Sequence, residues 1–149
     1  MGLRVYLTGH VAVEVDGRVV VHERQFRRRQ TRLVFAYLVC ERAVPTPRER
    51  LADVVWGGEP PPAWEVALSA LASRLRHLLA TSGLARLGVA LPHDPRYYQL
   101  RLPPDAWVDL EVCANAVDQA EGALRTGTYQ RVLGPAFVAA TLARRPFLA

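Results

Sequence analysis

The sequence predicts an α+β fold in two parts, and two observations support this. The spacing of apolar residues changes near Arg27 from every second position to every third or fourth, so strands precede helices. Pro103-Pro104 then separates a basic part from a slightly acidic one. Residues 1–104 carry 15 Arg and nine acidic residues, a net +6, whereas residues 105–149 carry four and five, a net −1. We therefore expect two domains, 1–104 and 105–149, and an anionic partner on the first.

The N-terminal segment reads as a small antiparallel sheet. Apolar and polar residues alternate from Leu3 to Leu7, valines recur from Val11 to Val15, and Val19–Val21 form a third apolar run. Asp16-Gly17 is a hairpin turn signal between the second and third runs.

A first helix is predicted in RQTRLVFAYLVCERA, which Pro45 and Pro47 follow. Its expected buried stripe consists of Leu33, Ala36, Tyr37 and Cys40. Cys40 and Cys113 are isolated cysteines without metal-ligand spacing, so we expect both to be inert buried thiols.

A second helix is predicted from about Arg48 to Trp56, with Leu51, Val54 and Val55 inward. Gly57-Gly58 ends it, and GGEPPP follows as a stiff exposed connection.

The third helix, expected from about Ala63 to Thr81, carries the clearest pattern. One side, expected to face the core, holds Trp64, Leu68, Leu71, Leu75, Leu78 and Leu79. The outward side is small and without acidic residues, and it consists of Val66, Ser69, Ala70, Ser73 and His77, flanked by Arg74 and Arg76. Such a face suits close approach to a polyanion, although an ordinary helix that packs on a partner helix gives the same pattern.

Two strand-like runs, LGVAL and YYQLRL, follow the third helix and are joined by the turn PHDPR. The order of sheet, three helices and hairpin is the layout of a winged helix-turn-helix, in which the third helix enters the major groove of DNA. In this layout Arg96 lies in the wing turn.

Residues 105–149 read as one helical hairpin. Its first stripe consists of Val108, Val112, Ala116, Val117, Ala120 and Leu124, with Gly127 as the cap, and a second helical run extends from 129 to 138. A single such pair cannot bury its apolar stripe alone. We therefore expect it to dock on the N-terminal sheet through Val112, Val117 and Leu124.

Three pieces of the sequence resemble one family of regulators. They are the Arg-Gln opening of the first helix, Val55-Trp56-Gly57 at the end of the second, and Ser73-Arg74-Leu75-Arg76 in the third. With these pieces, residues 3–102 resemble the antibiotic-regulatory-protein (SARP) family, whose first domain is an OmpR-type winged helix. Residues 105–149 are similar to the opening of the TPR-like bacterial transcriptional activation domain (BTAD) that follows in that family.

The resemblance implies a regulator that binds double-stranded promoter DNA, often as a second copy on direct repeats, and recruits RNA polymerase. It places DNA contacts on the outward face of the third helix, its flanking arginines and Arg96. It makes Glu59, Pro60, Pro61 and Pro62 candidate polymerase contacts, whereas Trp56 and Trp64 beside them are typical core anchors.

In the OmpR-type pattern, several exposed positions of the third helix carry polar or charged side chains that contact DNA bases. This chain departs from that pattern. Val66, Ser69 and Leu71 occupy those places, so bidentate base readers are missing and phosphate contacts should dominate. A degenerate winged helix that serves as a protein-interaction module is therefore the alternative function.

Other classes of function find little support in the sequence. The four His are dispersed, and there is neither a phosphate loop nor a nucleophile elbow, so we expect no metal, no cofactor and no enzyme activity. Asp105 and Asp109 fall at a helix start, where negative charge is stabilising. No membrane span or signal peptide is expected, which predicts a soluble, cytoplasmic and nucleoid-associated protein.

Overall fold

The computed structural model describes residues 2–125, 127 and 138. Its backbone divides into two compact units, one formed by Met1–Val19 together with Asp105–Ala149, and the other by Val20–Pro104. Each unit is described by itself below.

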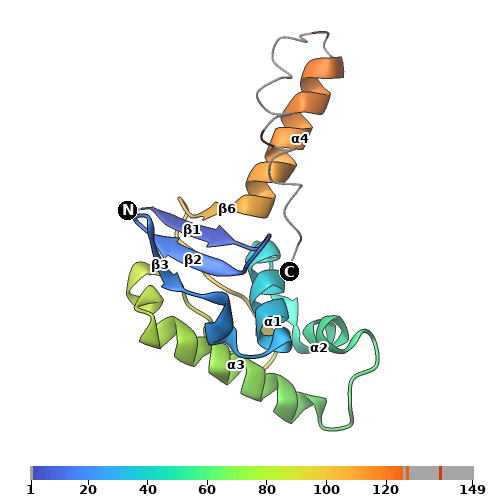
Figure 1. Ribbon diagram of the computed structural model, residues 1–149. Coiled ribbons are helices and arrows are strands. Elements are labelled where there is room, and N and C mark those ends of the chain that lie inside the picture. Colours follow the sequence, from blue (N-terminus) through green and yellow to red (C-terminus); the bar gives the residue numbers. More distant parts are fainter. Residues whose placement is uncertain (1, 126, 128–137, 139–149) are drawn as a thin grey trace. The chain divides into compact units, whose positions relative to one another are not determined.

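A four-stranded sheet with the order β3-β2-β1-β6 organises the first unit (Figure 1). Strands β1 (Leu3–Tyr6) and β2 (Ala12–Val15) pair antiparallel, as predicted, and β3 (Arg18–Val21) follows the turn at Asp16-Gly17. Both turn residues have positive φ, 52° and 80°, which explains the Asp-Gly pair. Strand β6 (Trp107–Val108) pairs in parallel with β1, a partner that the sequence did not predict.

The start of helix α4 (Asp109–Arg125) is tied to the end of β1 by one side chain. The carboxylate of Asp109 is fully buried and accepts hydrogen bonds from the backbone N–H groups of Leu7 (3.0 Å) and Thr8 (3.0 Å). It also accepts from the Thr8 hydroxyl at 2.7 Å and from the Leu110 N–H at 2.8 Å. Asp109 therefore satisfies buried donors directly after strand β1, about a hundred residues earlier, as well as the first turn of its own helix.

The expected docking of the tail on the sheet is only partly correct. Helix α4 contacts β1 and β6, but Val117 is 39% exposed and Leu124 is 52% exposed, while Val112 is half-buried. The helix leaves the sheet after its first turns (Figure 1), so its later apolar residues do not reach the strands. The Gly127 N–H bonds the Leu124 carbonyl at 3.3 Å, but the second helical run, 129–138, lies outside the described residues except for Val138.

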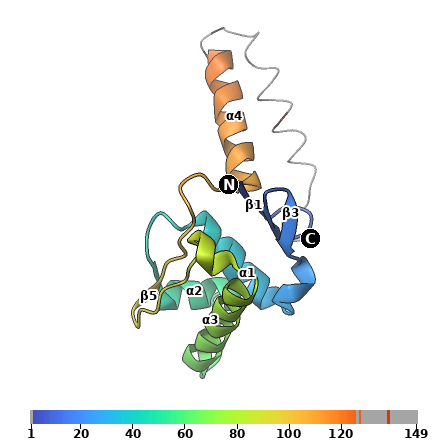
Figure 2. The same cartoon turned by 90° about the vertical axis from the view of Figure 1, so that its left-hand side faces the viewer.

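Three helices form the second unit (Figure 2). They are α1 (Arg29–Cys40), α2 (Arg48–Trp56) and α3 (Trp64–Thr81), each within two residues of its predicted start. The 3-10 helix η1 (Glu23–Phe26) precedes α1, and η2 (Leu84–Leu87) follows α3. The largest fully buried side chains of this unit are Phe35, Leu38, Leu51, Leu68, Leu75, Leu84 and Leu100.

The predicted stripe of α1 is rotated relative to the buried side. Val34, Phe35, Leu38 and Val39 are buried together with Ala36, whereas Leu33 and Tyr37 are only half-buried and Cys40 is exposed. The apolar residues of this helix lie on most of its sides, so their periodicity alone does not identify the side that faces the core. The expectation that both cysteines are buried is also wrong, because Cys113 is half-buried.

The predicted core side of α3 is confirmed. Its five leucines are all buried, and Leu71 is only 2% exposed, so it belongs to the core and cannot serve as an exposed reader. Trp56 and Trp64, expected as core anchors, are half-buried.

The wing differs from the predicted hairpin. Strand β5 (Tyr97–Tyr98) pairs antiparallel with β4 (Thr46–Pro47), which precedes α2, and not with the run LGVAL. Helix η2 takes up the start of that run, and one isolated bridge, Ala90 with Arg101, joins the two segments. Pairing with β4 therefore replaces most of the expected hairpin.

Candidate nucleic-acid interface

The outward face of α3 is open along the helix. Val66 is 74% exposed, and Ser69, Ala70, Ser73 and His77 are exposed as well. Glu65 in the first turn is also exposed, but the helix carries no acidic residue from Val66 to Thr81. This arrangement matches the face predicted from the sequence.

Arg48, which the sequence analysis did not predict as a site residue, is hydrogen-bonded to Ser69 on this face. Its Nη2 donates to the Ser69 hydroxyl at 2.9 Å and to the Glu65 carbonyl at 3.2 Å. Its guanidinium lies 5.8 Å from the centre of the Tyr98 ring, and its buried Nε has no hydrogen-bond partner among the described residues. As the first residue of α2 after Pro47, Arg48 thus links α2, α3 and the wing strand. The only feature of the sequence that could have indicated this role of Arg48 is its position at the predicted start of the second helix.

Arg76 was expected to flank the outward face, but its donors are used inside the unit. Its Nε donates to the Leu91 carbonyl at 2.7 Å and its Nη2 to the Pro92 carbonyl at 3.4 Å. Burial lowers the pKa of this half-buried side chain. Arg76 fastens α3 to the segment that leads into the wing turn, whereas Arg74 is exposed.

The wing turn presents Arg96 to solvent. Its side chain is 79% exposed and lies 5.7 Å from the Tyr97 ring centre. The Asp94 carboxylate accepts from the Arg96 N–H at 2.8 Å, and this bond lowers the pKa of Asp94. A hollow of about 400 Å³ lies beside the turn, and its lining consists of Arg48, Ser69, Ser73, Arg76, His93, Asp94, Pro95 and Tyr98.

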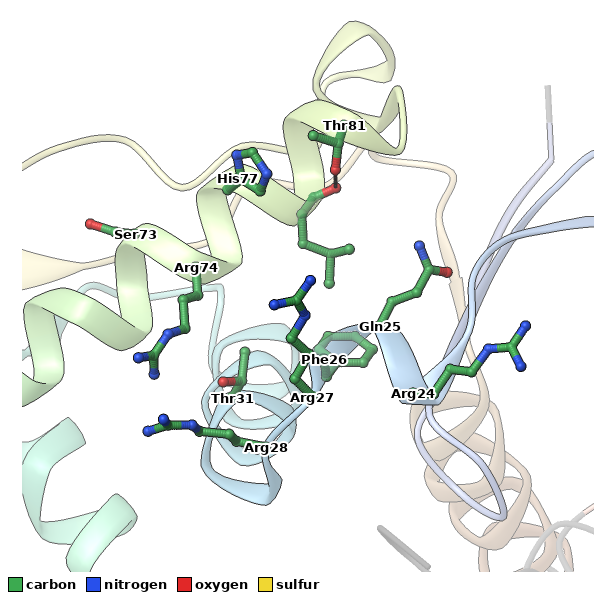
Figure 3. Close-up of a pocket in the computed structure, with 11 residues that line it drawn as sticks. Arg24, Gln25, Phe26, Arg27, Arg28, Thr31, Ser73, Arg74, His77 and Thr81 are labelled. Atoms are coloured by element: carbon green, nitrogen blue, oxygen red, sulfur yellow. Dashed lines mark hydrogen bonds between the residues drawn. The ribbon is translucent and has the colours of Figure 1, made fainter.

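A second hollow, of about 780 Å³, lies on the other side of Ser73 and is called here the arginine groove (Figure 3). None of the described residues that line it is acidic. Its lining combines η1, the start of α1 and the second half of α3: Arg24, Gln25, Phe26, Arg27, Arg28, Thr31, Ser73, Arg74, His77, Leu78 and Thr81. The sequence reasoning missed Arg24, Arg27 and Arg28. Their only signal is the run RRR at 27–29, which resembles any solvated charge cluster.

The connection between α2 and α3 contains the four residues expected to contact polymerase. Gly57 and Gly58 have φ of 62° and 86°, a conformation that glycine adopts without strain. Glu59 and Pro62 are exposed, and Pro60 and Pro61 are half-buried.

No group of three or more His, Cys, Asp or Glu is placed to hold a metal ion within the described part of the chain. None of its helices is long and apolar enough to cross a bilayer.

Comparison with known proteins shows a similarity at the level of structure. No family model matches the chain, and no curated protein matches it. A solved structure of EmbR shares the fold. That structure, Mycobacterium tuberculosis EmbR in complex with a low affinity phosphopeptide, aligns with a TM-score of 0.69 at 26% identity. The alignment covers 98% of this chain and 37% of the EmbR chain, so this chain spans little more than a third of EmbR.

EmbR is a SARP-family transcriptional regulator, and the similarity supports a SARP/OmpR-like winged-helix fold for this chain.

Proposed function

We propose that this chain is a DNA-binding transcription regulator whose α3 docks in the major groove of double-stranded promoter DNA. One observation carries the proposal: the exposed face of α3, acid-free from Val66 to Thr81, lies between two hollows that arginines line. A polyanion is the partner that best compensates this arrangement, because each bound phosphate releases condensed counterions.

The side chains on α3 favour contacts with phosphates and with the methyl groups of thymine. Val66 and Ala70 are exposed and small enough to touch thymine methyls, and Ser73 suits a base or a phosphate oxygen. The Ser69 hydroxyl already accepts a bond from Arg48, so it keeps its proton for an acceptor on DNA. Arg74, His77 and Arg96 supply the phosphate contacts, and Arg76 acts through the position of the wing turn.

The test is duplex binding by the 149-residue chain, first as a gel shift on genomic fragments with competitor DNA. Fluorescence anisotropy at several salt concentrations then gives the number of phosphates neutralised. Contact with about five to six phosphates predicts a log-log slope of about −5, because each releases about 0.9 of a counterion. No binding at low salt, or a slope near zero, contradicts the proposal.

The alternative is a protein-interaction module built on a degenerate winged helix. The 74% exposure of Val66 favours it, because an exposed apolar residue at the N-terminal end of this face also suits a protein surface. Val66→Lys separates the two functions. The added charge should strengthen non-specific duplex binding if α3 faces DNA and abolish a partner contact if it faces protein.

We further propose that Glu59 to Pro62 contact RNA polymerase and that a second copy binds on direct repeats. The support is the exposure of Glu59 and Pro62 on a connection fixed by two glycines. In vitro transcription with Glu59→Ala and Pro62→Ala should lose activation while duplex affinity is unchanged. Cooperative binding to two sites at direct-repeat spacing, against a single site, tests the second copy.

We also propose that residues 105–149 begin a TPR-like activation domain and that residues 1–104 act as the winged-helix domain. The exposed Val117 and Leu124 support the first part, because a helical array covers such residues with its next helix. Hydrogen exchange on the 149-residue chain tests it, since the amides near the exposed Leu124 should exchange faster than those near the buried Ala116.

A further inference from the structure

We propose that the arginine groove is a phosphate-binding site, and that a backbone phosphate of bound duplex DNA occupies it. This inference rests on the proposed function and extends the contact beyond α3 and the wing. Four features carry it: the start of α1, an unpaired buried hydroxyl, a strained arginine and the continuity of the groove with α3.

Helix α1 begins without a capping side chain or an acidic residue of its own, and Glu23 of η1 pairs with Arg32 at 3.3 Å. Its N-cap, Arg28, makes no side-chain capping bond, and its first turn contains no acidic residue. The first backbone N–H groups of a helix have no intrahelical acceptors and carry a partial positive charge. Instead of the usual Ser, Asp or Glu, this end carries Arg27, Arg28 and Arg29, so the fold leaves the positive potential for an external anion.

Thr31 provides an independent sign of an absent ligand. It lies in the first turn of α1, lines the groove and is 1% exposed. Its Oγ1 has no hydrogen-bond partner among the described residues. A buried hydroxyl without a partner destabilises a fold, so its presence here is best explained by a bound oxygen.

Arg27 is held in a strained conformation beside Thr31. Its φ of 64° and ψ of −46° place it at the centre of a γ-turn, closed by the Arg28 N–H and the Phe26 carbonyl at 2.7 Å. This turn is unfavourable for a residue with a Cβ, and such strain gathers at ligand sites. Phe26, 3% exposed and 5.1 Å from the Phe35 ring centre, anchors the turn. Figure 3 shows the Arg27 side chain extending from this turn toward α3.

The groove continues the proposed DNA face, which identifies the source of the phosphate. Ser73, Arg74 and His77 belong to the outward face of α3 and also line the groove. The described part of the chain gives neither Arg27 nor Arg74 a carboxylate partner. A duplex against α3 therefore brings its backbone to groove residues whose charge is not compensated within the protein.

The experiment compares variants of the 149-residue chain in duplex binding and in thermal unfolding. Thr31→Val keeps the shape and removes the hydroxyl. We expect about tenfold weaker duplex binding, because a hydrogen bond to a charged group is lost. The melting temperature should stay the same or rise, because an unpaired polar group is also removed. If Thr31 only stabilises the fold, Thr31→Val should lower the melting temperature and leave duplex binding unchanged. That outcome overturns the proposal.

Arg27 and a matched arginine provide the charge test. Arg27→Gln should weaken duplex binding and lower the magnitude of the salt slope by about 0.9. Arg86→Gln, an exposed arginine outside both hollows, should leave the slope unchanged. Arg27→Gly should weaken binding equally without lowering the melting temperature, because glycine relieves the strain of a positive φ.

A titration with inorganic phosphate, followed by NMR at the amides of Gln30 and Thr31, separates the sources of the phosphate. Shifts that Arg27→Gln abolishes, together with its weaker duplex binding, support the proposal. If the variants lose these shifts but bind duplex as tightly as the parent, a free phosphorylated ligand occupies the site and the DNA assignment is overturned. If they change neither readout, the inference fails while the proposed function stands. If the parent chain binds no duplex, both fall.

Discussion

Replacing Asp109 with Ala should destabilise the first unit severely, and the hydrogen bonds give the size of the effect. The substitution leaves the N–H groups of Leu7 and Thr8 without their acceptor, and these residues are 0% and 4% exposed. Each unsatisfied buried donor costs about 1–3 kcal/mol. The lost bond to the Leu110 N–H in the first turn of α4 adds about 1 kcal/mol, as for other lost helix caps. The expected loss is about 3–7 kcal/mol, a large share of the 5–15 kcal/mol typical of a domain.

Urea unfolding, followed by circular dichroism and by tryptophan fluorescence, measures this loss. Asp118→Ala is the matched control, because Asp118 is an exposed carboxylate on the same helix and its removal should change the free energy of unfolding by less than about 0.5 kcal/mol. Asp109→Asn should fall between the two, because the amide keeps one acceptor oxygen but turns a donor toward other donors. If Asp109→Ala unfolds within about 1 kcal/mol of the parent, the bonds to β1 do not stabilise the unit and the reasoning is wrong.

Three further predictions concern the site and its support. Arg74→Ala should weaken binding to all duplexes and reduce the magnitude of the salt slope by about 1, while the free energy of unfolding stays the same. Arg76→Ala should lower the free energy of unfolding by about 1–2 kcal/mol, because its bond to the Leu91 carbonyl is lost. Anisotropy and urea unfolding measure the two effects, and the opposite pattern would exchange the roles of the two arginines. The pKa of Asp94 is lowered in the folded state, so its contribution should be present above about pH 3.9 and disappear as the pH falls below it. The melting temperature of Asp94→Asn should accordingly differ from the parent at pH 6, and the difference should disappear as the pH falls through the lowered pKa of Asp94. Parallel curves would show that Asp94 does not stabilise the wing turn. Deleting residues 105–149 should lower the melting temperature, because β6 and Asp109 are lost. The affinity for duplex DNA should stay nearly the same. Much tighter binding by the shortened chain would mean that residues 105–149 cover α3.

Helix α3 was predictable because the spacing of its apolar residues is unambiguous. Five leucines at helical spacing fix its buried side, and the small residues opposite are left exposed. Helix α1 was less predictable because apolar residues surround it, and only packing within its unit determines that Val34 and Phe35 are buried while Leu33 is half-buried.

The parts that sequence reasoning missed depend on contacts between distant residues. Strand β5 pairs with β4 about 50 positions earlier, and β6 pairs with β1 about 100 positions earlier, although each pairing involves only two residues per strand. Runs this short carry no periodicity. The arginine groove likewise forms only when η1 and α3 meet, so RRR at 27–29 gave no sign that it lines a shared surface.

The position of β1 between β2 and β6 has a consequence for synthesis of the chain. Until Trp107 and Val108 have been translated, one side of β1 keeps its N–H and C=O groups unpaired, next to the buried Leu3 and Val5. At about 5–20 residues per second, this open edge persists for roughly 5–20 s on the ribosome. Open apolar edges recruit strands from other chains. A nascent chain that stalls before residue 107 is therefore an aggregation risk, and ribosome density near codon 107 should govern the soluble yield of this protein.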